Sequence, residues 1–490
     1  MRYNSLSGRS HQVTIFFSLG RVLYLIVIPV SRGVITALQG GIQLWAMGTW
    51  ADILVLIFMA VFALASWRRC VYQCSEFCLS VRSGVFWKRH TSIPWESIST
   101  LSVTTPFYLR PLRASLLRAC TIAGNRRHAD ASIYIHTSAA RKILEFYEDI
   151  TEEKREGVEG SSERIYYMPK LPSIAAFALL SSNTLAGIIF IATFISQSGR
   201  ILGDEFSEWL ITSFERISRD FAMGIPPAAA AMAYAILFGW LIALAFMLTR
   251  YHRFKLEQAD GRLYVSSGFF TKREYIVRKS HISYTDIRQT LGTRILRLYT
   301  LYIRAPGYAD QKDDISCVLP ARKKDDFMGE YAVFFPEITP APRQIKPARR
   351  GIWGYILQPL ILCGVIAAAA LLLFIKFEAM RDFILFAALM LLAPGLLFLA
   401  VRLIDFRSGG ISCEGDVYTL RYSRGFKLHT IIAPREKVVK ATLRQNPIQR
   451  RNGNCNLTIY TEGVRADAHT CRNMIRGEVK DIAFVVARNI

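Results

Sequence analysis

The sequence predicts a polytopic α-helical membrane protein that carries three soluble α+β domains. Three observations predict this class. The 490 residues are 52% hydrophobic with a mean hydropathy of +0.24, which is more apolar than an ordinary soluble protein. Long apolar stretches occur in three pairs, and a polar, strand-rich segment follows each pair. These polar segments share one pattern of turns and strands, so we expect a threefold internal repeat.

Six apolar stretches are long enough, or nearly so, to cross the roughly 30 Å hydrocarbon core of a bilayer as helices. They are Leu19–Leu38 with Ala51–Trp67, Pro172–Ile195 with Ile225–Leu248, and Ile352–Phe374 with Phe383–Val401. We expect each pair to form a helical hairpin. Three charged residues of the first pair, Arg21, Arg32 and Asp52, are expected near helix ends, where long arginine side chains reach the interface.

The repeat divides the chain into six parts. We expect hairpin 1 at residues 1–67, copy 1 of the soluble domain at 68–171, hairpin 2 at 172–250, copy 2 at 251–345, hairpin 3 at 346–402 and copy 3 at 403–490. Residues 201–221 of hairpin 2 have aromatic and apolar residues at helical spacing among charged ones. They predict an amphipathic helix on the outer membrane face or, alternatively, a solvated linker.

A glycine marks the same place in each copy. Short β-rich runs in copy 2 are separated by turns at Asp260-Gly261 and Ser267-Gly268, because glycine accepts positive φ without a steric clash. Gly84, Gly268 and Gly425 precede a buried-type aliphatic residue by 14, 14 and 13 positions. Each copy also ends in a helical pattern, at 138–150, 322–335 and 471–486. Several strands closed by a C-terminal helix is an α+β plan in which the helix covers a sheet or a barrel mouth.

Charge predicts the orientation. The chain has 61 Lys and Arg against 38 Asp and Glu, a net charge of +23. Basic clusters flank the three copies, whereas the opposite loops are uncharged, mixed or balanced, so the copies and both termini should be cytosolic. The N-terminal segment predicts a retained anchor and not a signal peptide. The nine cysteines are expected to stay reduced, and Cys70, Cys74 and Cys78 do not have the spacing of a zinc site.

The repeated residues resemble the bacterial PH-domain membrane proteins of the YdbT type. In copy 2 the resemblance rests on Leu263, Val265, Ser267-Gly268-Phe269-Phe270, Arg273, Ile282, Ile287 and Gln289. In copy 3 it rests on Gly425-Phe426, Val438, Gln445-Asn446-Pro447 and Arg450-Arg451, while copy 1 has Thr104-Thr105-Pro106 where the others have glutamine. The resemblance implies PH-like β-barrels with a C-terminal helix, a bacterial inner-membrane location and a smaller partner with one hairpin and one such domain. It implies no reaction.

The residues after each repeated glycine are the best candidates for function. Aromatic side chains beside Lys and Arg suit a membrane interface with anionic headgroups. The candidates for binding lipid or a partner are Phe86, Trp87, Lys88, Arg89, Phe269, Phe270, Lys272, Arg273, Phe426 and Lys427. The plainer interpretation, which the sequence alone favours, is that the phenylalanines fill the barrel core while the basic residues are solvated. Specific phosphoinositide binding is not expected, because the first hairpin loop of copy 2, residues 257–262, lacks a basic cluster.

No pattern of residues predicts catalysis. The sequence has no H-E-x-x-H motif, no Walker A loop and no G-x-G-x-x-G loop after a strand. We therefore expect a non-enzymatic scaffold or adaptor without metal, cofactor or nucleic acid, with envelope stress or resistance as a candidate setting. The alternative is a transport or lipid-handling protein whose six helices form a pathway; the polar run 181–184 and the prolines of 226–227 and 359 would suit one, although packing and kinks explain them too.

Overall fold

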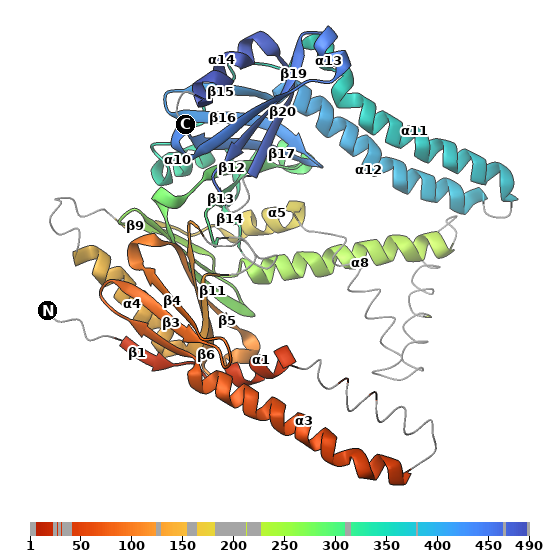
Figure 1. Ribbon diagram of the computed structural model, residues 1–490. Helices are drawn as coiled ribbons and strands as arrows, with labels where there is room; N and C mark the ends of the chain where they lie inside the picture. The colour runs from red at the N-terminus through yellow and green to blue at the C-terminus, as the bar shows by residue number, and fades with distance from the viewer. Residues whose placement is uncertain are drawn as a thin grey trace. The chain divides into compact units, whose positions relative to one another are not determined.

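The computed structural model describes residues 6–22, 42–123, 129–153, 164–181, 227–308, 315–378, 381–463 and 467–487, together with the single residues 27, 31 and 212. Its strands form four sheets (Figure 1). The chain divides into two compact units. Unit 1 contains residues 1–166, 255–281 and 305–314, and unit 2 contains residues 167–254, 282–304 and 315–490.

Copy 1 folds as two sheets and a helix within unit 1. The first sheet has the order β1-β2-β3-β4, with β1 at Leu6–Arg9, β2 at Val71–Cys74, β3 at Cys78–Ser83 and β4 at Arg89–Pro94. Strands β5 (Ile98–Pro106), β6 (Ala114–Thr121) and β7 (Ala131–His136) follow, and helix α4 (Thr137–Glu153) closes the copy. Burial largely alternates along β6 and β7, so one face of these strands lines a core, whereas the first six residues of β5 are all buried.

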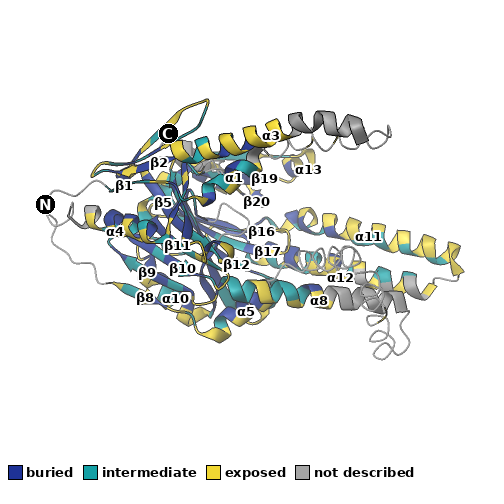
Figure 2. Cartoon of the chain, turned by 90° about the horizontal axis from the view of Figure 1, so that it is seen from below, coloured by how far each residue is buried: buried dark blue, intermediate teal, exposed yellow. Residues whose placement is uncertain are grey.

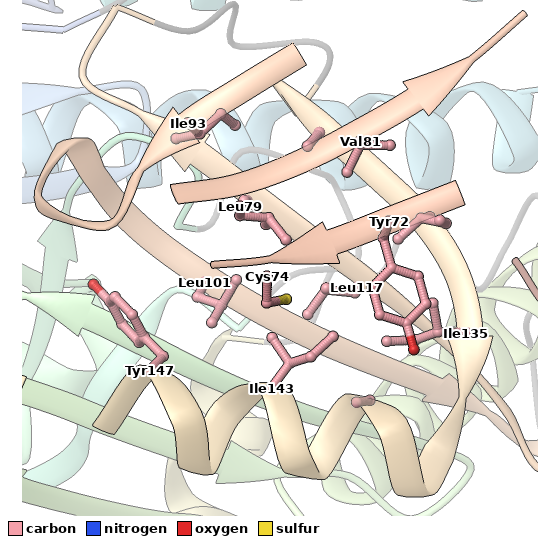
Figure 3. Packing of buried hydrophobic residues seen from close by; sticks show 14 of the residues in the cluster. Tyr72, Cys74, Leu79, Val81, Ile93, Leu101, Leu117, Ile135, Ile143 and Tyr147 are labelled. Carbon is pink, nitrogen blue, oxygen red and sulfur yellow. The ribbon is translucent and has the colours of Figure 1, made fainter. Parts of the chain in front are cut away.

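Helix α4 covers this core. Ile143 projects from α4 toward Cys74 and Leu117, and Tyr147 lies one turn further on, beside Leu101 (Figure 3). Ile143 and Leu101 are fully buried. The helix expected at 138–150 is therefore present, and the apolar side chains that predicted it are the ones that pack on the sheets.

The second sheet of unit 1 contains strands from two copies. Its order is β7-β6-β5-β11-β10-β9-β8, with β8 at Ile165–Tyr167, β9 at Lys255–Ala259, β10 at Arg262–Ser267 and β11 at Thr271–Arg278. Strand β11 of copy 2 pairs antiparallel with β5 of copy 1, with Ile276 opposite Leu101 and Lys272 opposite Thr105. The first three strands of copy 2 thus extend the second half of copy 1.

Unit 2 repeats this arrangement one copy later. The sheet order is β14-β13-β12-β17-β16-β15, formed by β12 (Tyr284–Gln289), β13 (Leu298–Arg304), β14 (Cys317–Lys323), β15 (Gly410–Glu414), β16 (Val417–Arg424) and β17 (Lys427–Pro434). Strand β17 of copy 3 pairs with β12 of copy 2, with Ile432 opposite Thr285 and Leu428 opposite Gln289. These residues correspond to the ones that pair in unit 1. The two places where strands of successive copies pair, here called the strand junctions, therefore have the same register.

Copy 3 ends with a three-stranded sheet and a helix. The sheet contains β18 (Val438–Arg444), β19 (Asn454–Thr461) and β20 (Asp467–Ile475), and α14 (Arg476–Ala487) packs on it. Copy 2 has the corresponding helix α10 (Lys324–Phe334). The structure therefore contains repeated β-sheet domains, each closed by a helix. The predicted limits of the six parts stay a prediction.

A short strand precedes hairpins 1 and 2, and a single β-bridge precedes hairpin 3; the sequence did not predict them. Strand β1 pairs with β2, β8 lies at the edge beside β9, and Ile345 forms a β-bridge with Ile411 of β15. In all three places the hairpin leaves the sheet after one strand and returns to the next. Each hairpin is therefore inserted into a sheet, which ties its ends to the soluble copy.

Among the described residues, six helices lie within the expected hairpins. They are α1 (Val13–Val22), α3 (Ile42–Arg69), α5 (Leu171–Ser181), α8 (Pro227–Arg250), α11 (Trp353–Lys376) and α12 (Arg381–Ser408). Two stretches of the described residues are long and apolar enough to cross a membrane, Arg349–Lys376 and Ala387–Ser408. Helix α11 leaves most of its surface exposed (Figure 2), as a helix that faces lipid would.

Six spans are thus not established by the described residues. Leu171–Leu180 and Leu237–Arg250 are shorter apolar helices. Much of the spans predicted at 19–38 and 172–195 lies outside the described residues. The amphipathic segment predicted at 201–221 also lies outside them, apart from Thr212.

Candidate functional site

The repeated glycines form tight turns at one end of the sheets. These glycine turns join β3 to β4, β10 to β11 and β16 to β17. Gly84 and Gly268 have φ of +104° and +112°, and a Cβ atom on either would lie 1.9 Å from a backbone carbonyl oxygen of the same turn. Only glycine fits such a position. Gly425 has φ of +60° with open space around it, in a shorter turn that places Arg424 opposite Lys427.

The aromatic residues of these turns point away from the core. Phe86 is 69% exposed and Trp87 88%, while Phe269, Phe270 and Phe426 are each about half exposed, at 51%, 50% and 51%. The interpretation that these side chains fill a barrel core is therefore wrong. The physical reason is that they belong to the turns and not to the strands, so the alternation that directs strand side chains inward does not include them.

Two glycine turns contact the helix that leads into their own sheet. The ring of Phe86 lies 5.9 Å from that of Phe62 in α3, and Arg69 Nη1 donates a 2.6 Å hydrogen bond to the carbonyl of Val85. The ring of Phe426 lies 5.7 Å from that of Phe398 in α12. Phe398 belongs to the stretch Ala387–Ser408, which is long and apolar enough to cross a membrane. These turns thus lie alongside the apolar part of the helices.

A second set of turns carries the same mixture of apolar and basic side chains, and sequence reasoning did not identify it. These helical turns join β5 to β6, β12 to β13 and β18 to β19, and they lie at Phe107–Leu109, α9 (Leu291–Ile295) and α13 (Pro447–Arg451). Their exposed apolar residues are Phe107, Tyr108, Leu112, Ile295, Leu296 and Ile448, and their basic residues are Arg110, Arg113, Arg294, Arg297, Arg450 and Arg451.

Local hydrogen bonds shape two of the helical turns. Thr290 with Thr293, and Asn446 with Gln449, form capping boxes in which each side chain satisfies a backbone N–H of the other residue. The glutamines of the family motif brace the same turns. Gln289 Nε2 donates to the carbonyl of Leu298 at 2.9 Å, and Gln445 Nε2 to that of Asn454 at 2.6 Å. The capping pattern was the sequence signal that could have revealed these turns.

In copy 1 the base of the helical turn also has a hydrogen bond between strands, formed by different residues. Thr105 occupies the position of Gln289 and Gln445, and its hydroxyl lies 2.7 Å from that of Ser115 on the neighbouring strand. The threonine of copy 1 thus also makes a cross-strand contact at the base of its turn, although it does not reach a backbone carbonyl as the glutamines do.

Strand pairing at the junctions brings the two kinds of turn together. In unit 1 the ring of Phe270 lies 6.2 Å from Phe107 and 5.2 Å from Phe269. Arg110 Nη2 donates to the carbonyl of Phe269. In unit 2 the pairing of Gln289 with Leu428 places α9 beside the turn at residues 425–426. Each junction therefore presents two adjacent turns with exposed apolar and basic side chains.

The predicted basic residues differ in their surroundings. Lys88 and Arg89 are exposed. Lys272 Nζ lies 2.5 Å from Glu274 Oε1, and Arg273 Nη1 donates to the carbonyl of Thr271 at 3.4 Å. Lys427 is exposed, but desolvation of its amine and the positive charge of Arg288 lower its pKa. The cations of copy 1 are thus available to anionic groups, whereas those of copy 2 are already engaged in part.

The described residues contain no group of three or more His, Cys, Asp or Glu side chains that could hold a metal ion. The cysteines within this part of the chain are free thiols. Cys74 is fully buried, and burial raises its pKa to about 12, so its thiol is unreactive at neutral pH.

The comparisons with known proteins agree with the repeated architecture. The model of the bacterial PH domain matches three segments, residues 16–150, 187–328 and 360–487. The chain belongs to the bacterial PH domain family. It is also similar to the UPF0699 transmembrane protein YdbT of Bacillus subtilis (strain 168), with 21% identity over 324 residues that cover 63% of this chain.

That match covers 64% of the length of YdbT, so the chain spans less than two thirds of this relative. No solved structure matches the chain. The resemblance predicted from the glycine turns is confirmed. Each segment matched by the PH-domain model begins within a predicted hairpin and extends into the closing helix of the copy that follows, and the third segment includes that helix to its end.

Proposed function

We propose that this protein is a non-enzymatic scaffold of the bacterial inner membrane whose PH-like domains bind the cytosolic membrane surface through their glycine turns and helical turns. The observation that carries the proposal is the exposure of the aromatic rings of the glycine turns beside basic residues and beside apolar helices. In this account the three hairpins supply six spans, and both termini and all three copies are cytosolic.

The geometry of α12 supports the insertion of the glycine turn of copy 3 into the membrane. Phe398 lies roughly ten residues before the end of α12, a distance of about 15 Å along a helix axis. A helix that crosses the bilayer with its basic end at Arg402 and Arg407 would hold Phe398 within the membrane, and Phe426 with it. Aromatic rings prefer this interfacial region, where they bury apolar surface.

Basic residues would add an electrostatic contribution. A Lys or Arg near an anionic membrane surface contributes about 1 kcal/mol, which falls off within a Debye length. The exposed Lys88 and Arg89 of copy 1 and the arginines of the helical turns meet this condition. Several weak contacts of this kind would fix the orientation of a domain that the hairpins already hold at the membrane.

The proposal is tested with the full chain in nanodiscs of neutral lipid and in nanodiscs that contain anionic lipid. Hydrogen exchange should be slower at residues 84–88 and 268–271 in anionic nanodiscs, while the turn at Gly415-Asp416, at the other end of the sheet of copy 3, should not change. Phe269→Ala combined with Lys272→Ala should abolish the protection in copy 2. Equal exchange of the glycine turns in both lipids and in detergent would overturn the proposal.

A partner protein with a PH-like domain would have a defined place to bind. Strands β4 and β18 end their sheets, and among the described strands nothing pairs with their outer edges. These edges correspond to the ones that pair at both junctions, so a partner could add a strand there. Exposed Arg89, His90, Lys440 and Arg444 on the two strands favour an acidic partner strand over a second copy of this chain.

A photo-crosslinking residue at Ser92 of β4 tests this route. A crosslink to a smaller PH-domain membrane protein would support it. A crosslink to a second copy of this chain, or no crosslink in native membranes, would contradict it.

A further inference from the structure

A basic pocket of about 630 Å³ lies inside unit 2, between the second strand junction and the end of α12. Strands β12, β16 and β17, the helical turn α9 and the last turn of α12 contribute to its wall. Four arginines line it: Arg294, Arg343, Arg407 and Arg421. Ile287, Met328, Ile404 and Leu428 supply an apolar part of the wall. A volume of this size is within the range of small-molecule sites, and the lining combines apolar side chains with convergent polar groups.

The four guanidinium groups keep their charge uncompensated. Arg294 Nη1 donates to Gln289 Oε1 at 2.8 Å, Arg343 Nη1 to the carbonyl of Gly409 at 3.3 Å and also to that of Arg407, and Arg421 Nη2 to the carbonyl of Ala341. All of these acceptors are neutral oxygens. Within the described part of the chain, no carboxylate lies within 4.0 Å of any of the four.

Arg421 has a donor with no partner among the described residues. Its Nη1 atom is buried and makes no hydrogen bond. Arg343 lines the same pocket, and burial together with this like charge lowers the pKa of Arg421. A buried donor without an acceptor costs about 1–3 kcal/mol. An anionic ligand would remove this cost and the repulsion between the two arginines.

The acidic residues near the pocket are already occupied. Asp405 lines it, but its Oδ2 atom accepts a 2.6 Å hydrogen bond from Ser423 and lies 3.8 Å from Arg402 Nη1. Asp286 is buried behind the wall, between Arg288 and His429. The four arginines outnumber this one acidic residue of the lining, so the net charge that a ligand meets is positive.

We propose that this pocket binds a phosphate group, carried either by a lipid headgroup or by a soluble phosphorylated compound. Arginine matches phosphate because its planar guanidinium donates two parallel hydrogen bonds to two oxygens. The residues Ile404 to Ser408 form the last turn of the stretch Ala387–Ser408 that is able to cross a membrane, and headgroup phosphates lie at the level where such a helix ends. The apolar wall would hold the part of the ligand next to the phosphate.

The other junction does not repeat this chemistry. Arg421 lies opposite Thr430 in the β16–β17 pair, and the corresponding residue of unit 1 is Ser266, opposite Glu274 in the β10–β11 pair. The arginine that extends into the pocket therefore belongs to copy 3 and is not required for folding a junction. Arg343 also has a structural role, because it donates hydrogen bonds to backbone carbonyls at the end of α12.

The test uses the full chain in detergent, without a bilayer, so that it does not depend on membrane binding by the glycine and helical turns. Isothermal titration compares inorganic phosphate, short-chain phosphatidic acid and short-chain phosphatidylcholine. We expect phosphatidic acid or phosphate to bind, and Arg421→Gln and Arg294→Gln each to weaken that binding at least tenfold. Arg421→Lys should retain more affinity than Arg421→Gln. Lys480→Gln, which removes an exposed charge of α14 in the same unit, should leave the affinity unchanged.

The probes distinguish the two sources of the phosphate. Binding of phosphatidic acid at least tenfold tighter than inorganic phosphate would identify a lipid ligand, whereas equal affinity would identify a soluble one. The proposal is overturned if neither probe binds, or if the two arginine-to-glutamine variants bind as tightly as the parent while they keep its melting temperature. If Arg421→Gln fails to fold, Arg294→Gln decides, because Arg294 lies in an exposed turn and, among the described residues, its side chain bonds only to Gln289.

Discussion

The two strand junctions share a backbone arrangement and differ in their side chains. At both, the third strand of one copy pairs with a strand of the preceding copy in the same register. The junction of unit 1 places Ser102 opposite Tyr275, and its turns carry exposed aromatic rings. The junction of unit 2 has Asp286 at the position of Ser102, opposite Ile431. The repeat thus determines how the strands pair, while the side chains at equivalent positions differ between the two junctions.

Asp286 is the centre of a buried ionic network. Its carboxylate lies 2.5 Å from Arg288 Nε on its own strand and 3.0 Å from His429 Nδ1 across the junction. Burial alone would raise its pKa, but Arg288 and His429 lower it below the usual value, so the carboxylate is ionised at neutral pH. The ring of Tyr302 covers the guanidinium of Arg288, with its centroid 4.0 Å away. The junction of unit 1 has a serine in place of this acid.

The largest expected difference between the junctions comes from removing these equivalent residues. Asp286→Ala leaves Arg288 and His429 near each other without their anion, and breaking a buried ion pair costs about 3–5 kcal/mol. Ser102→Ala should cost about 1 kcal/mol or less, since it removes one neutral hydroxyl. Thermal unfolding of the two variants in the same detergent measures both. Equal losses of melting temperature would show that the ionic network does not stabilise the second junction.

Acid should destabilise unit 2 through His469. This side chain is buried between Tyr422 and Thr461, with ring nitrogens 2.9 and 3.1 Å from their hydroxyl oxygens. Burial lowers its pKa to about 4. The unfolded chain, in which the histidine pKa is about 6.5, therefore binds more protons between pH 6.5 and 4, and stability falls as the pH falls through this window, by up to about 3 kcal/mol.

Hydrogen exchange of β20 at pH 7 and pH 5 measures this loss, with β6 of unit 1 as the internal comparison. His469→Gln should remove the dependence in this window. An equal loss of protection in both strands, or a loss of protection in β20 that persists in the variant, would contradict the assignment to His469. Asp286 contributes to the free energy of unfolding in a lower pH range, because the stabilisation by its carboxylate is lost only as the pH falls below about 4.

The glycine turns should differ in their tolerance of a side chain. Gly268→Ala would place Cβ 1.9 Å from the carbonyl oxygen of Thr271, so the turn must distort, at about 2–3 kcal/mol. Gly425→Ala has open space and only the penalty of positive φ, about 1 kcal/mol. Melting temperatures of the two variants give the order. A larger effect at Gly425 would contradict the geometry of these turns.

The smallest expected effect concerns the glutamine that braces the helical turn of copy 3. Gln445→Ala removes the hydrogen bond to the carbonyl of Asn454, a loss of about 1 kcal/mol, and should loosen α13 without affecting α9. Hydrogen exchange within α13 measures it. Unchanged exchange would show that the capping box of Asn446 and Gln449 is sufficient.

The repeat and the closing helices were predictable because they depend on local patterns. A glycine with positive φ, alternating strands and a helical apolar face are each encoded within a few residues. The sharing of strands between copies was not predictable, since β11 has the same alternation whether it pairs with its own copy or with β5. The strands before the hairpins also escaped prediction, because β8 has only three residues.

The candidate site was predictable only in part, for a similar reason. The glycine turns were identified, but the alternation of strands gives no direction for Phe269 or Phe426 once the chain enters a turn. The basic pocket could not be found from the sequence at all. Arg294, Arg343 and Arg421 belong to different copies or connections and come together only because β12 pairs with β17.

Depth measurement by lipid quenching tests membrane binding of the glycine turns most directly. Phe426→Trp and Asp416→Trp place a new indole at opposite ends of β16, about 25 Å apart for a strand of eight residues. Each variant is reconstituted with brominated lipids and compared with the parent chain, which has eight tryptophans. We predict that the added fluorescence at position 426 is quenched and that at position 416 is not. Equal quenching at both positions, or none at position 426, would contradict the account.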